Sequence, residues 1–509
     1  MRKYNKAARP HPEPHTTNSS SYPEATPYSN KKERAIGNIE RGSLTSKQFD
    51  VLTTVLKGYN VFFTGEAGTG KSHLLRVMVT ALQQQLGANH VYVTASTGIA
   101  ANHIDGTTIH SFAGITSPDI NPAYIYKQIL NQSTKEVINH WKTCEVLIID
   151  EISMIDGRFF DTLEYKARRV RNNNLPFGGI QVILCGDFFQ LPPVGLDKNG
   201  VKFAFEAHSW DTVIEKIMVL TTAFRQQDQR LQKLLRDIRY GQCSQQSLQL
   251  IDEMSNYDVD AMLSNSTPDH EMGEVVEEIG EESMVIESTH LFAKNDEAIK
   301  YNKMKLDELK GSSKPYKAVD KEFVANGIKK LNKHCLAAPS IEIKQGAQVM
   351  LLKNLDLKMG LVNGVSGKVI SFARDCEGGE LLPLIRWKTR NGDLTKLCHR
   401  VEFKISKEGK TLACRSQLPI RLAWGVTIHK AQGMTLEYLT IDLSDVFECG
   451  MTYVAMSRGV TCDHMCVKGF KKEDVKTNPR VLAFDKTIQG EREAPHPVQS
   501  APVIRLYPF

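Results

Sequence analysis

Eight consecutive residues combine glycines, a lysine and a hydroxyl at a spacing that suits phosphate binding. The segment GEAGTGKS at 65–72 fits G-x-x-x-x-G-K-[S/T], follows an apolar run and opens a helical pattern. Glycines let such a loop curl until its backbone N–H groups face phosphate oxygens. Lys71 would reach the terminal phosphates of a nucleotide, and Ser72 would ligate Mg²⁺. We predict that the loop contacts the nucleotide through Gly65, Glu66, Ala67, Gly68, Thr69, Gly70, Lys71 and Ser72.

An acidic pair supplies the second half of a hydrolytic site. In IIDEIS at 148–153, Asp150 ends an apolar run and Glu151 follows it. Asp150 at a strand end can hold Mg²⁺ through water, and Glu151 can polarise an attacking water. Such a pair indicates little alone. Beside a phosphate loop it strongly indicates a hydrolytic site, because hydrolysis needs both an anchor for Mg²⁺ and a group that positions water.

A glutamine precedes the first strand of this region. Gln48 lies in LTSKQFDVL, just before the run that leads into the phosphate loop. Its amide has the donor and acceptor needed to read the edge of adenine. An exposed glutamine on a helix explains it equally well, and both interpretations stay open.

Five apolar, β-branched runs frame these motifs, and helical periodicity separates several of them. The runs lie at 60–65, 90–95, 145–150, 180–186 and 215–220. Continuous apolar strands that alternate with helices are typical of a parallel sheet covered on both faces. The first half of the chain is therefore predicted to be an α/β domain.

The second half changes character twice. Strand-like runs at 289–294, 347–354, 367–373 and 381–387 have frequent glycine turns and little helical pattern, which favours a small β-barrel module. Buried-strand patterns return at 439–443 and 464–470, with the helix-like MTYVAMSR between them. These patterns predict two α/β lobes, the second interrupted by a β insertion.

Composition limits the classes of protein to consider. The 509 residues are too many for one core, and 41% hydrophobic with 24% charged residues fits a soluble globular protein. No apolar run approaches the roughly 20 residues needed to span a bilayer, so no membrane partner is expected. The net charge of +6 is compatible with a polyanionic partner without proving one.

The cysteines and the polar segments add little chemistry. Ten cysteines without a dense framework indicate reduced thiols in an intracellular protein. Cys462, His464 and Cys466 lack a second pair at finger-like spacing, so we expect a strand with incidental thiols and no zinc. Residues 1–42 are typical of a disordered tail, and 253–283 of an acidic, flexible insertion.

An ordered set of motifs resembles the PIF (petite integration frequency) DNA helicases of superfamily one, which are related to the bacterial RecD helicases. The resemblance covers roughly residues 43–475, and the segment after Asp156, up to Arg171, is similar to the PIF signature. In order, the motifs are LTSKQ, GEAGTGKS, VTASTGIAA, GTTIHSFAGI, LIIDEISMI, GDFFQLPPV, FRQ, NGVSGKV, AWGVTIHKAQGMTL and YVAMSR.

The resemblance implies an α/β fold class with two RecA-like parallel-sheet lobes and a small SH3-like β-barrel inserted in the second. The implied division is a tail at 1–42, a first lobe at 43–230 with a small insertion near 104–140, the start of the second lobe at 231–346, the SH3-like insertion at 347–415, the end of the second lobe at 416–475 and a C-terminal tail at 476–509.

The resemblance also assigns roles around the triphosphate. Gln190 in GDFFQLPPV corresponds to a sensor of the γ-phosphate, and the prolines after it would place its turn in advance. Arg225 in FRQ and Arg458 in YVAMSR resemble arginine fingers, which stabilise transition-state charge and make hydrolysis depend on lobe closure. Gly433 in HKAQG would let the backbone approach the phosphates.

Several motifs contact single-stranded DNA in relatives. Hydroxyls and backbone amides suit phosphate contacts, and His or Phe rings can stack on bases, although a structural role is about equally plausible for each residue. The implied DNA contacts are Thr97, His110, Ser111, Phe112, Thr427, His429, Lys430, Thr452, Tyr453 and Ser457.

The function that the resemblance implies is an ATP-dependent DNA helicase that moves 5′ to 3′ and splits forks, G-quadruplexes and RNA–DNA hybrids. Its expected settings are replication, repair, recombination and telomere control. The expected partners are single-stranded and forked or structured DNA, bound by a monomer or by a dimer formed on DNA. Basic residues near the start and KKER at 31–34 leave the nucleus, the mitochondrion or both open as locations.

Three other functions stay open. A RecD-like or transfer-type helicase subunit of a larger complex is disfavoured by the lack of a nuclease or relaxase segment in this sequence. A phosphate-loop switch that binds partners without moving on DNA is disfavoured by Gln190 together with Arg225 and Arg458. An inactive DNA-binding scaffold is disfavoured by the intact phosphate loop and acidic pair.

Overall fold

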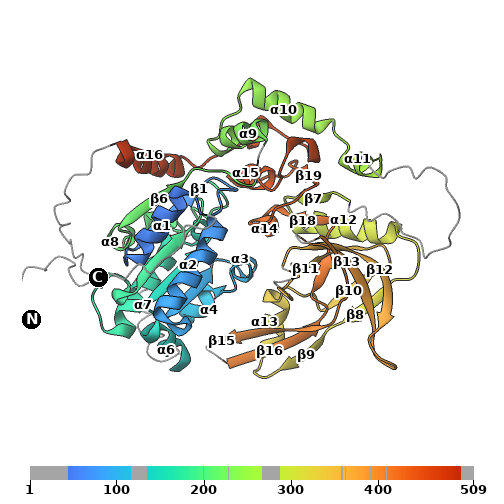
Figure 1. The fold of residues 1–509 in the computed structure, drawn as a ribbon, viewed down its shortest axis with the longest axis horizontal. Coiled ribbons are helices and arrows are strands. Elements are labelled where there is room, and N and C mark those ends of the chain that lie inside the picture. Colours follow the sequence, from blue (N-terminus) through green and yellow to red (C-terminus); the bar gives the residue numbers. More distant parts are fainter. Residues whose placement is uncertain are drawn as a thin grey trace, which may run out of the picture.

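The structure, a computed structural model, describes residues 44–115, 135–198, 200–226, 228–265, 287–356, 359–361, 363–389, 392–407 and 410–493. The predicted tail at 1–42 and the 266–283 part of the predicted flexible insertion lie outside the described residues. Two parallel sheets and an antiparallel module are arranged side by side, with the first lobe in blue and green and the module in yellow and orange (Figure 1).

Lobe 1 is built on a six-stranded parallel sheet with the order β3-β2-β4-β5-β1-β6. Its strands are β1 Val61–Gly65, β2 Val91–Ala95, β3 Thr107–Thr108, β4 Val146–Asp150, β5 Gln181–Cys185 and β6 Lys216–Leu220. Its helices are α1 Ser46–Leu56, α2 Lys71–Leu86, α3 Gly98–His103, α4 Ile109–Ala113, α6 Lys135–Thr143, α7 Gly157–Arg171 and α8 Trp210–Val213. The five strands predicted in this region are confirmed.

Helices cover both faces of the lobe 1 sheet. Phe63 and Ile148 belong to one apolar core with side chains of α1 and α2. Their neighbours Phe62 and Leu147 belong to a second core with α7, and this core continues into lobe 2. Alternation along each strand sends successive side chains to opposite faces, so a continuous apolar run serves two layers.

Lobe 2 has a smaller parallel sheet with the order β18-β7-β19-β20. Its strands are β7 Thr289–Phe292, β18 Gly425–Thr427, β19 Leu439–Asp442 and β20 Met465–Lys468. Its helices are α9 Gln229–Arg239, α10 Gln245–Ser255, α11 Val259–Asn265, α12 Asn295–Glu308, α14 Ile428–Ala431 and α15 Met451–Met456. This is the expected α/β class with two parallel-sheet lobes.

The predicted flexible insertion begins later than residue 253. Residues 253–255 end α10, and 259–265 form α11. The side chains of Met254 and Val259 are buried, so apolar contacts hold this part of the chain. The prediction missed these contacts because it was based on the acidic composition of the segment.

The antiparallel module forms three sheets, with the orders β14-β13-β12-β11-β17, β15-β16-β9 and β10-β8. Its elements are β8 Lys314–Lys317, β9 Val319–Glu322, α13 Gly327–His334, β10 Ser340–Ile343, β11 Gln348–Leu351, β12 Ser366–Arg374, β13 Leu381–Thr389, β14 Gly392–Leu397, β15 Val401–Lys407, β16 Lys410–Gln417 and β17 Ile420–Leu422. The module begins before the predicted limit of 347, because β9 pairs with β16, and it ends after the predicted limit of 415, because β17 pairs with β11.

The last described helix returns to lobe 1. In α16, Pro479–Glu493, the ring of Phe484 stacks on Phe205 with 4.3 Å between centroids, and Arg480 pairs with Glu206 at 3.1 Å. The predicted C-terminal tail is therefore wrong for residues 479–493, because apolar side chains at helical spacing find a binding surface on lobe 1. Figure 1 shows this helix in dark red on the lobe 1 side of the molecule.

Two further properties concern the whole described part of the chain. None of its helices combines the length and the apolar character required to cross a bilayer. Within the same residues, no three His, Cys, Asp or Glu side chains gather closely enough to hold a metal ion.

Candidate functional site

The phosphate loop and the acidic pair meet at one edge of the lobe 1 sheet. The loop follows β1, Asp150 ends β4, and β5 lies between these two strands in the sheet. Because the carboxyl ends of parallel strands share an edge, residues far apart in the sequence converge there. Asp187 and Gln190, which follow β5, join them.

The phosphate loop is folded tightly enough that its glycines are required. Gly68 and Gly70 have φ angles of +83° and +78°. A Cβ on Gly68 would lie 2.5 Å from Gln226 Oε1, and one on Gly70 would lie 2.7 Å from Gln48 Nε2. The Lys71 ammonium donates to the carbonyl oxygens of Gly65 at 2.7 Å and of Glu66 at 3.0 Å, so its charge sits at the loop. These features fit a cradle for phosphate oxygens.

Gln48 is buried beside the loop, with 2% of its surface exposed. Its Oε1 accepts the Thr45 N–H at 3.0 Å, which completes a capping box at the start of α1. Its Nε2 donates to the Thr69 carbonyl oxygen at 3.3 Å. The interpretation of an exposed helix glutamine is therefore wrong, and the amide ties α1 to the phosphate loop.

The acidic pair stands in a desolvated position at the end of β4. Asp150 Oδ1 accepts the Glu151 N–H at 2.9 Å, and Glu151 has a φ of +52°, in the left-handed region that few side chains adopt. Burial raises the pKa of Asp150. Burial and the negative charge of Asp150 raise the pKa of Glu151 to about 7. A carboxyl group with a pKa near neutral can both orient a water and take its proton.

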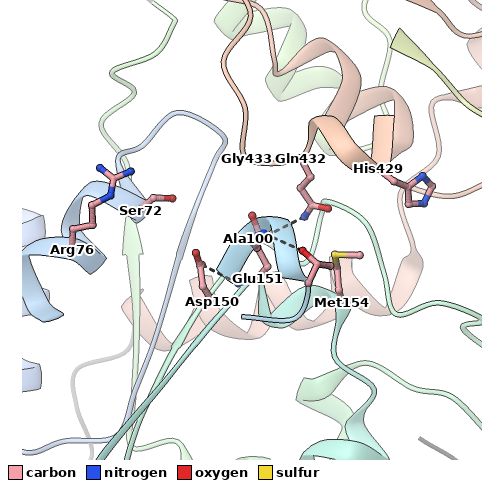
Figure 2. A pocket seen from close by; sticks show the side chains of 10 residues that line it. Ser72, Arg76, Ala100, Asp150, Glu151, Met154, His429, Gln432 and Gly433 are labelled. Atoms are coloured by element: carbon pink, nitrogen blue, oxygen red, sulfur yellow. Dashed lines mark hydrogen bonds between the residues drawn. The ribbon is translucent and has the colours of Figure 1, made fainter. Parts of the chain in front are cut away.

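Groups from both lobes line a pocket at this place. Figure 2 shows Ser72 and Asp150 of lobe 1 on one side, with Gln432 and His429 of lobe 2 on the other. Gln432 Nε2 donates to Glu151 Oε2 at 3.0 Å, directly across the lobe boundary. The lining residues are Ser72, Arg76, Thr97, Ala100, Asp150, Glu151, Met154, His429, Gln432 and Gly433.

The donor set in this pocket suits a magnesium ion. Ser72 contributes a hydroxyl and Asp150 a carboxylate to the same pocket wall. Mg²⁺ prefers one or two hard oxygen ligands from the protein and completes its shell with water and substrate phosphates. The Ser72 and Asp150 pair, both predicted as metal ligands, therefore has the right chemistry for that ion.

The loop after β5 brings two buried polar groups to the lobe boundary. The Oε1 oxygen of Gln190 is buried and has no hydrogen-bond partner among the described residues. Asp187 pairs with Arg239 at 3.0 Å and is fully buried. Burial alone would raise the pKa of Asp187, but the charges of Arg239 and Lys71 outweigh it and lower that pKa. The loop after β5 thus holds an unpaired amide oxygen and an ionised carboxylate that is close enough to Lys71 to be affected by its charge.

The two predicted arginine fingers lie beside each other. Arg225 Nη1 donates to the Ser457 carbonyl oxygen at 2.9 Å, and Arg458, 1% exposed, donates to backbone oxygens of its own lobe. Burial lowers the pKa of Arg225 to about 10, and burial together with the charge of Arg225 lowers the pKa of Arg458 to about 9. Two desolvated cations whose charges affect each other suit a site for an anion such as a triphosphate.

Gly433 lies at the same pocket and has a φ of +81°. This backbone conformation favours glycine, and it follows directly on Gln432, which bonds Glu151.

Four of the predicted DNA contacts lie at accessible positions. His110 stacks on Phe159 with 4.5 Å between ring centroids, and Ser111 is exposed beside it. On lobe 2, His429 is 3.5 Å from Glu448, and the exposed Lys430 donates to Asn295 at 2.9 Å. Thr97 lines the pocket, and Thr427 is buried at the start of α14.

Four other predicted DNA contacts have buried side chains. Phe112 is 2% exposed and packs on Trp141 with 4.7 Å between ring centroids, so it belongs to the core of lobe 1. Thr452, Tyr453 and Ser457 are buried in or next to α15, at the boundary with lobe 1. In this structure the side chains of these four are withdrawn from solvent, as that of Thr427 is, and their contact with DNA stays a prediction.

Sequence interpretation missed three residues of the site. Gln432 bonds Glu151, and Gln226 donates to the carbonyl oxygens of Ser457 and Gly459. Both stand inside motifs, HKAQG and FRQ, so their position was the available signal. Arg239, the partner of Asp187, lies in α9 outside every motif, and its sequence context carries no signal.

Comparison with known proteins decides the family. The PIF1-like helicase family model matches residues 43–249, and a model described as DNA helicase Pif1, 2B domain, matches residues 328–372. The crystal structure of Pif1 helicase from Candida albicans is 35% identical, with a TM-score of 0.71, over 88% of this chain and 99% of that one.

The chain belongs to the PIF1-like helicase family.

Two more relatives place it within this family. The ATP-dependent DNA helicase PIF1 of Xenopus laevis is 41% identical over 88% of this chain, but the match spans only 65% of that protein's length. A Bacteroides Pif1 helicase, solved in complex with ADP-AlF3 and single-stranded DNA, is 27% identical with a TM-score of 0.63, over 88% of this chain and 98% of that one. The second of the two matched family models lies within the antiparallel module of this PIF1-like chain.

Proposed function

We propose that the protein is an ATP-dependent DNA helicase that moves 5′ to 3′ along one strand and unwinds the duplex ahead of it. The observation that carries this proposal is the composition of the hydrolytic site. Lobe 1 supplies Lys71, Asp150 and Glu151, while lobe 2 supplies Gln432 and Arg458. A site divided in this way makes hydrolysis depend on the relative position of two lobes, which is what a translocating motor requires.

Each residue near the nucleotide has a distinct task. The loop N–H groups and Lys71 bind and orient the phosphates, and Ser72 with Asp150 would hold Mg²⁺. The ion, when bound, neutralises phosphate charge. Glu151, with a pKa of about 7, orients the attacking water and accepts its proton.

Three further groups respond to the terminal phosphate. Arg225 and Arg458 stabilise the charge that develops on the transferred group. The unpaired Oε1 of Gln190 is an acceptor that can hold the attacking water through its proton. Arg458 comes from lobe 2, so its contribution requires the lobes to be closed.

The strand path crosses both lobes. His110 and Ser111 offer contacts on lobe 1, and His429 and Lys430 offer contacts on lobe 2. His429 also lines the pocket that contains Asp150. A change of the nucleotide in this pocket therefore alters the surroundings of a DNA contact. Alternating grip by the two lobes as they open and close moves the protein along the strand.

The biological setting is also part of the proposal. Forks, G-quadruplexes and RNA–DNA hybrids are its substrates, in replication, repair, recombination and telomere control. It acts as a monomer or as a dimer formed on DNA, in the nucleus, the mitochondrion or both. Light scattering with and without a forked substrate tests the assembly state, and microscopy of the tagged full chain tests the location.

The decisive test is ATP-dependent unwinding of matched duplexes that carry either a 5′ or a 3′ single-stranded tail, with Lys71→Ala as control. We expect unwinding from the 5′ tail alone. Unwinding from the 3′ tail would reverse the polarity, and DNA-stimulated hydrolysis without unwinding would favour a switch protein. Activity confined to a larger purified assembly would favour a RecD-like subunit.

A further inference from the structure

Helix α15 of lobe 2 lies directly on the phosphate site of lobe 1. At its start, Gly450 packs so closely that a Cβ there would lie 2.7 Å from the Phe189 carbonyl oxygen and 2.6 Å from that of Gln190. At its end, the Ser457 carbonyl oxygen accepts a hydrogen bond from Arg225 at 2.9 Å. The helix therefore contacts lobe 1 at both ends.

Tyr453 lies between them and reaches the phosphate loop itself. Its side chain is 2% exposed. Its hydroxyl oxygen accepts the backbone N–H of Ala67 at 2.8 Å, and the hydroxyl donates to Asp187 Oδ2 at 3.3 Å. Asp187 Oδ1 in turn accepts from Arg239 at 3.0 Å. A continuous chain of hydrogen bonds therefore runs from Arg239 through Asp187 and Tyr453 to the loop.

The charges along this chain fix the direction of its hydrogen bonds. Burial and the negative charge of Asp187 raise the pKa of Tyr453 far above its usual range, so the phenol keeps its proton. Arg239 and Lys71 lower the pKa of Asp187 in spite of burial, so the carboxylate stays ionised. Tyr453 therefore donates to Asp187, and its oxygen is left as the acceptor for Ala67.

Ala67 is the third residue of the loop that must cradle phosphate. A phosphate oxygen carries charge and forms a stronger hydrogen bond with an N–H group than a neutral phenol does. A nucleotide and Tyr453 thus compete for one donor. Because Tyr453 belongs to lobe 2, the outcome of this competition changes one of the links that hold α15 on lobe 1.

We propose that Tyr453 is an interlobe positioning residue, which couples the phosphate loop to lobe 2 by exchanging the Ala67 N–H with a nucleotide phosphate. The inference rests on the proposed helicase function and adds a residue to its coupling step. When phosphate takes the N–H, Tyr453 keeps only Asp187, while α15 stays closed on lobe 1 through the bond from Arg225 to the Ser457 carbonyl oxygen. When phosphate leaves, the phenol recovers the N–H.

The test compares Tyr453→Phe with wild type in the full chain, because phenylalanine keeps the packing and removes both hydrogen bonds. A bond to a charged acceptor is lost, so we expect the unwinding rate to fall about tenfold. The affinity for a fluorescent ATP analogue should not weaken, since a competitor for the loop is removed. Tyr438→Phe is the matched control, since Tyr438 belongs to lobe 2 and stacks on His464.

The outcomes separate coupling from a merely structural role. An unchanged unwinding rate, or a rate that falls only in step with a weaker nucleotide affinity, would overturn the proposal. If Tyr453→Phe melts well below wild type, the unwinding rate and the nucleotide affinity are measured at a temperature at which both chains are folded, and they must show the same separation there.

Failure of the proposed function has a different signature. A wild-type chain that hydrolyses ATP without unwinding DNA would remove the helicase proposal. DNA-stimulated hydrolysis by Tyr453→Phe and wild type would then decide the role of Tyr453, with equal rates overturning it.

Discussion

The two parallel sheets that meet at the nucleotide site are built in different ways. In lobe 1, β1, β4 and β5 are buried along all five of their residues, and apolar layers cover both faces. In lobe 2, the strands have three or four residues each, and the neighbours β7 and β18 are separated in sequence by the whole antiparallel module.

This difference suggests that lobe 1 binds the nucleotide and that lobe 2 controls how fast it is hydrolysed. The phosphate loop, Asp150 and Glu151 stand on the deeply buried sheet, whose side chains are fixed by close packing. Gln432, Tyr453 and Arg458 stand in or beside short helices of lobe 2, and they reach the site only across the lobe boundary. Loss of a lobe 1 group should therefore abolish binding or chemistry, while loss of a lobe 2 group should slow turnover.

The largest expected effect is in lobe 1. Lys71→Ala should abolish ATP hydrolysis, because the ammonium that faces the phosphates is removed. Binding of a labelled single strand, measured by fluorescence anisotropy, should persist. Lys57→Ala, an exposed change at the end of α1, is the control. Turnover of Lys71→Ala near the wild-type rate would contradict the role of the loop.

Arg458→Ala should leave ATP binding intact and lower kcat by roughly a thousandfold or more, as the loss of an arginine finger does. The affinity of a fluorescent ATP analogue and steady-state phosphate release measure the two properties separately. Arg169→Ala, at an exposed arginine in the last turn of α7, controls for the loss of a positive charge. An unchanged kcat would remove Arg458 from the site and weaken the contrast between the lobes.

A substitution in α16 tests whether the stability of lobe 1 depends on a helix that follows lobe 2 in the sequence. Phe484→Ala removes a half-buried ring that stacks on Phe205, and it should lower the free energy of unfolding by about 2 kcal/mol. Urea unfolding followed by circular dichroism measures this loss. Lys486→Ala, exposed on the same helix, should be silent. Equal stability of the two variants would show that α16 does not hold lobe 1.

The smallest expected effect concerns a polar contact at the sheet of lobe 2. Asp260 lies 3.6 Å from His290 of β7 and accepts the Ser288 N–H at 2.8 Å. Burial alone would raise its pKa, but the bonds from His290 and Ser288 outweigh burial and lower the pKa of Asp260 to about 2. The folded state thus favours the ionised carboxylate.

The sign of the pH dependence follows. A carboxyl group with a pKa of about 2 in the folded chain and roughly 4 in the unfolded chain stabilises the fold above pH 4, and this stabilisation is lost as the pH falls toward 2. Asp260→Asn should therefore lower Tm by about 2 °C at pH 6, with the difference shrinking between pH 4 and 2. A difference that stays constant over this range would contradict the shifted pKa.

The sequence predicted the frame of the molecule well wherever burial is continuous. The runs that became β1, β4 and β5 are apolar along their length, and such runs are buried in almost any compact fold. The beginning of the module was missed because β8 and β9 are short and mostly polar, and they are strands only through pairing with β10 and β16. Helix α16 was missed because its partner surface lies on lobe 1.

The residues of the candidate site also fall into those that the sequence predicted and those that it did not. The types and spacing in GEAGTGKS and in IIDEIS are set by phosphate and metal chemistry, so the residues alone indicated a phosphate loop and an acidic pair. The tasks of Gln48, Phe112 and Tyr453 depend on what lies beside them, and all three are buried by neighbours remote in sequence. No spacing rule distinguishes a tyrosine that faces DNA from one that faces the phosphate loop.

By itself, the sequence determined the alternation of strands and helices and the local chemistry of each motif, because both depend on residues within a few positions of one another. Only the tertiary structure decided which motifs share a pocket and which side chains are withdrawn from solvent. It brought Gln432 to Glu151 and Tyr453 to Ala67 across 281 and 386 residues of chain. Contacts over such separations are fixed by how the sheets and helices pack, and that packing is a property of the whole chain.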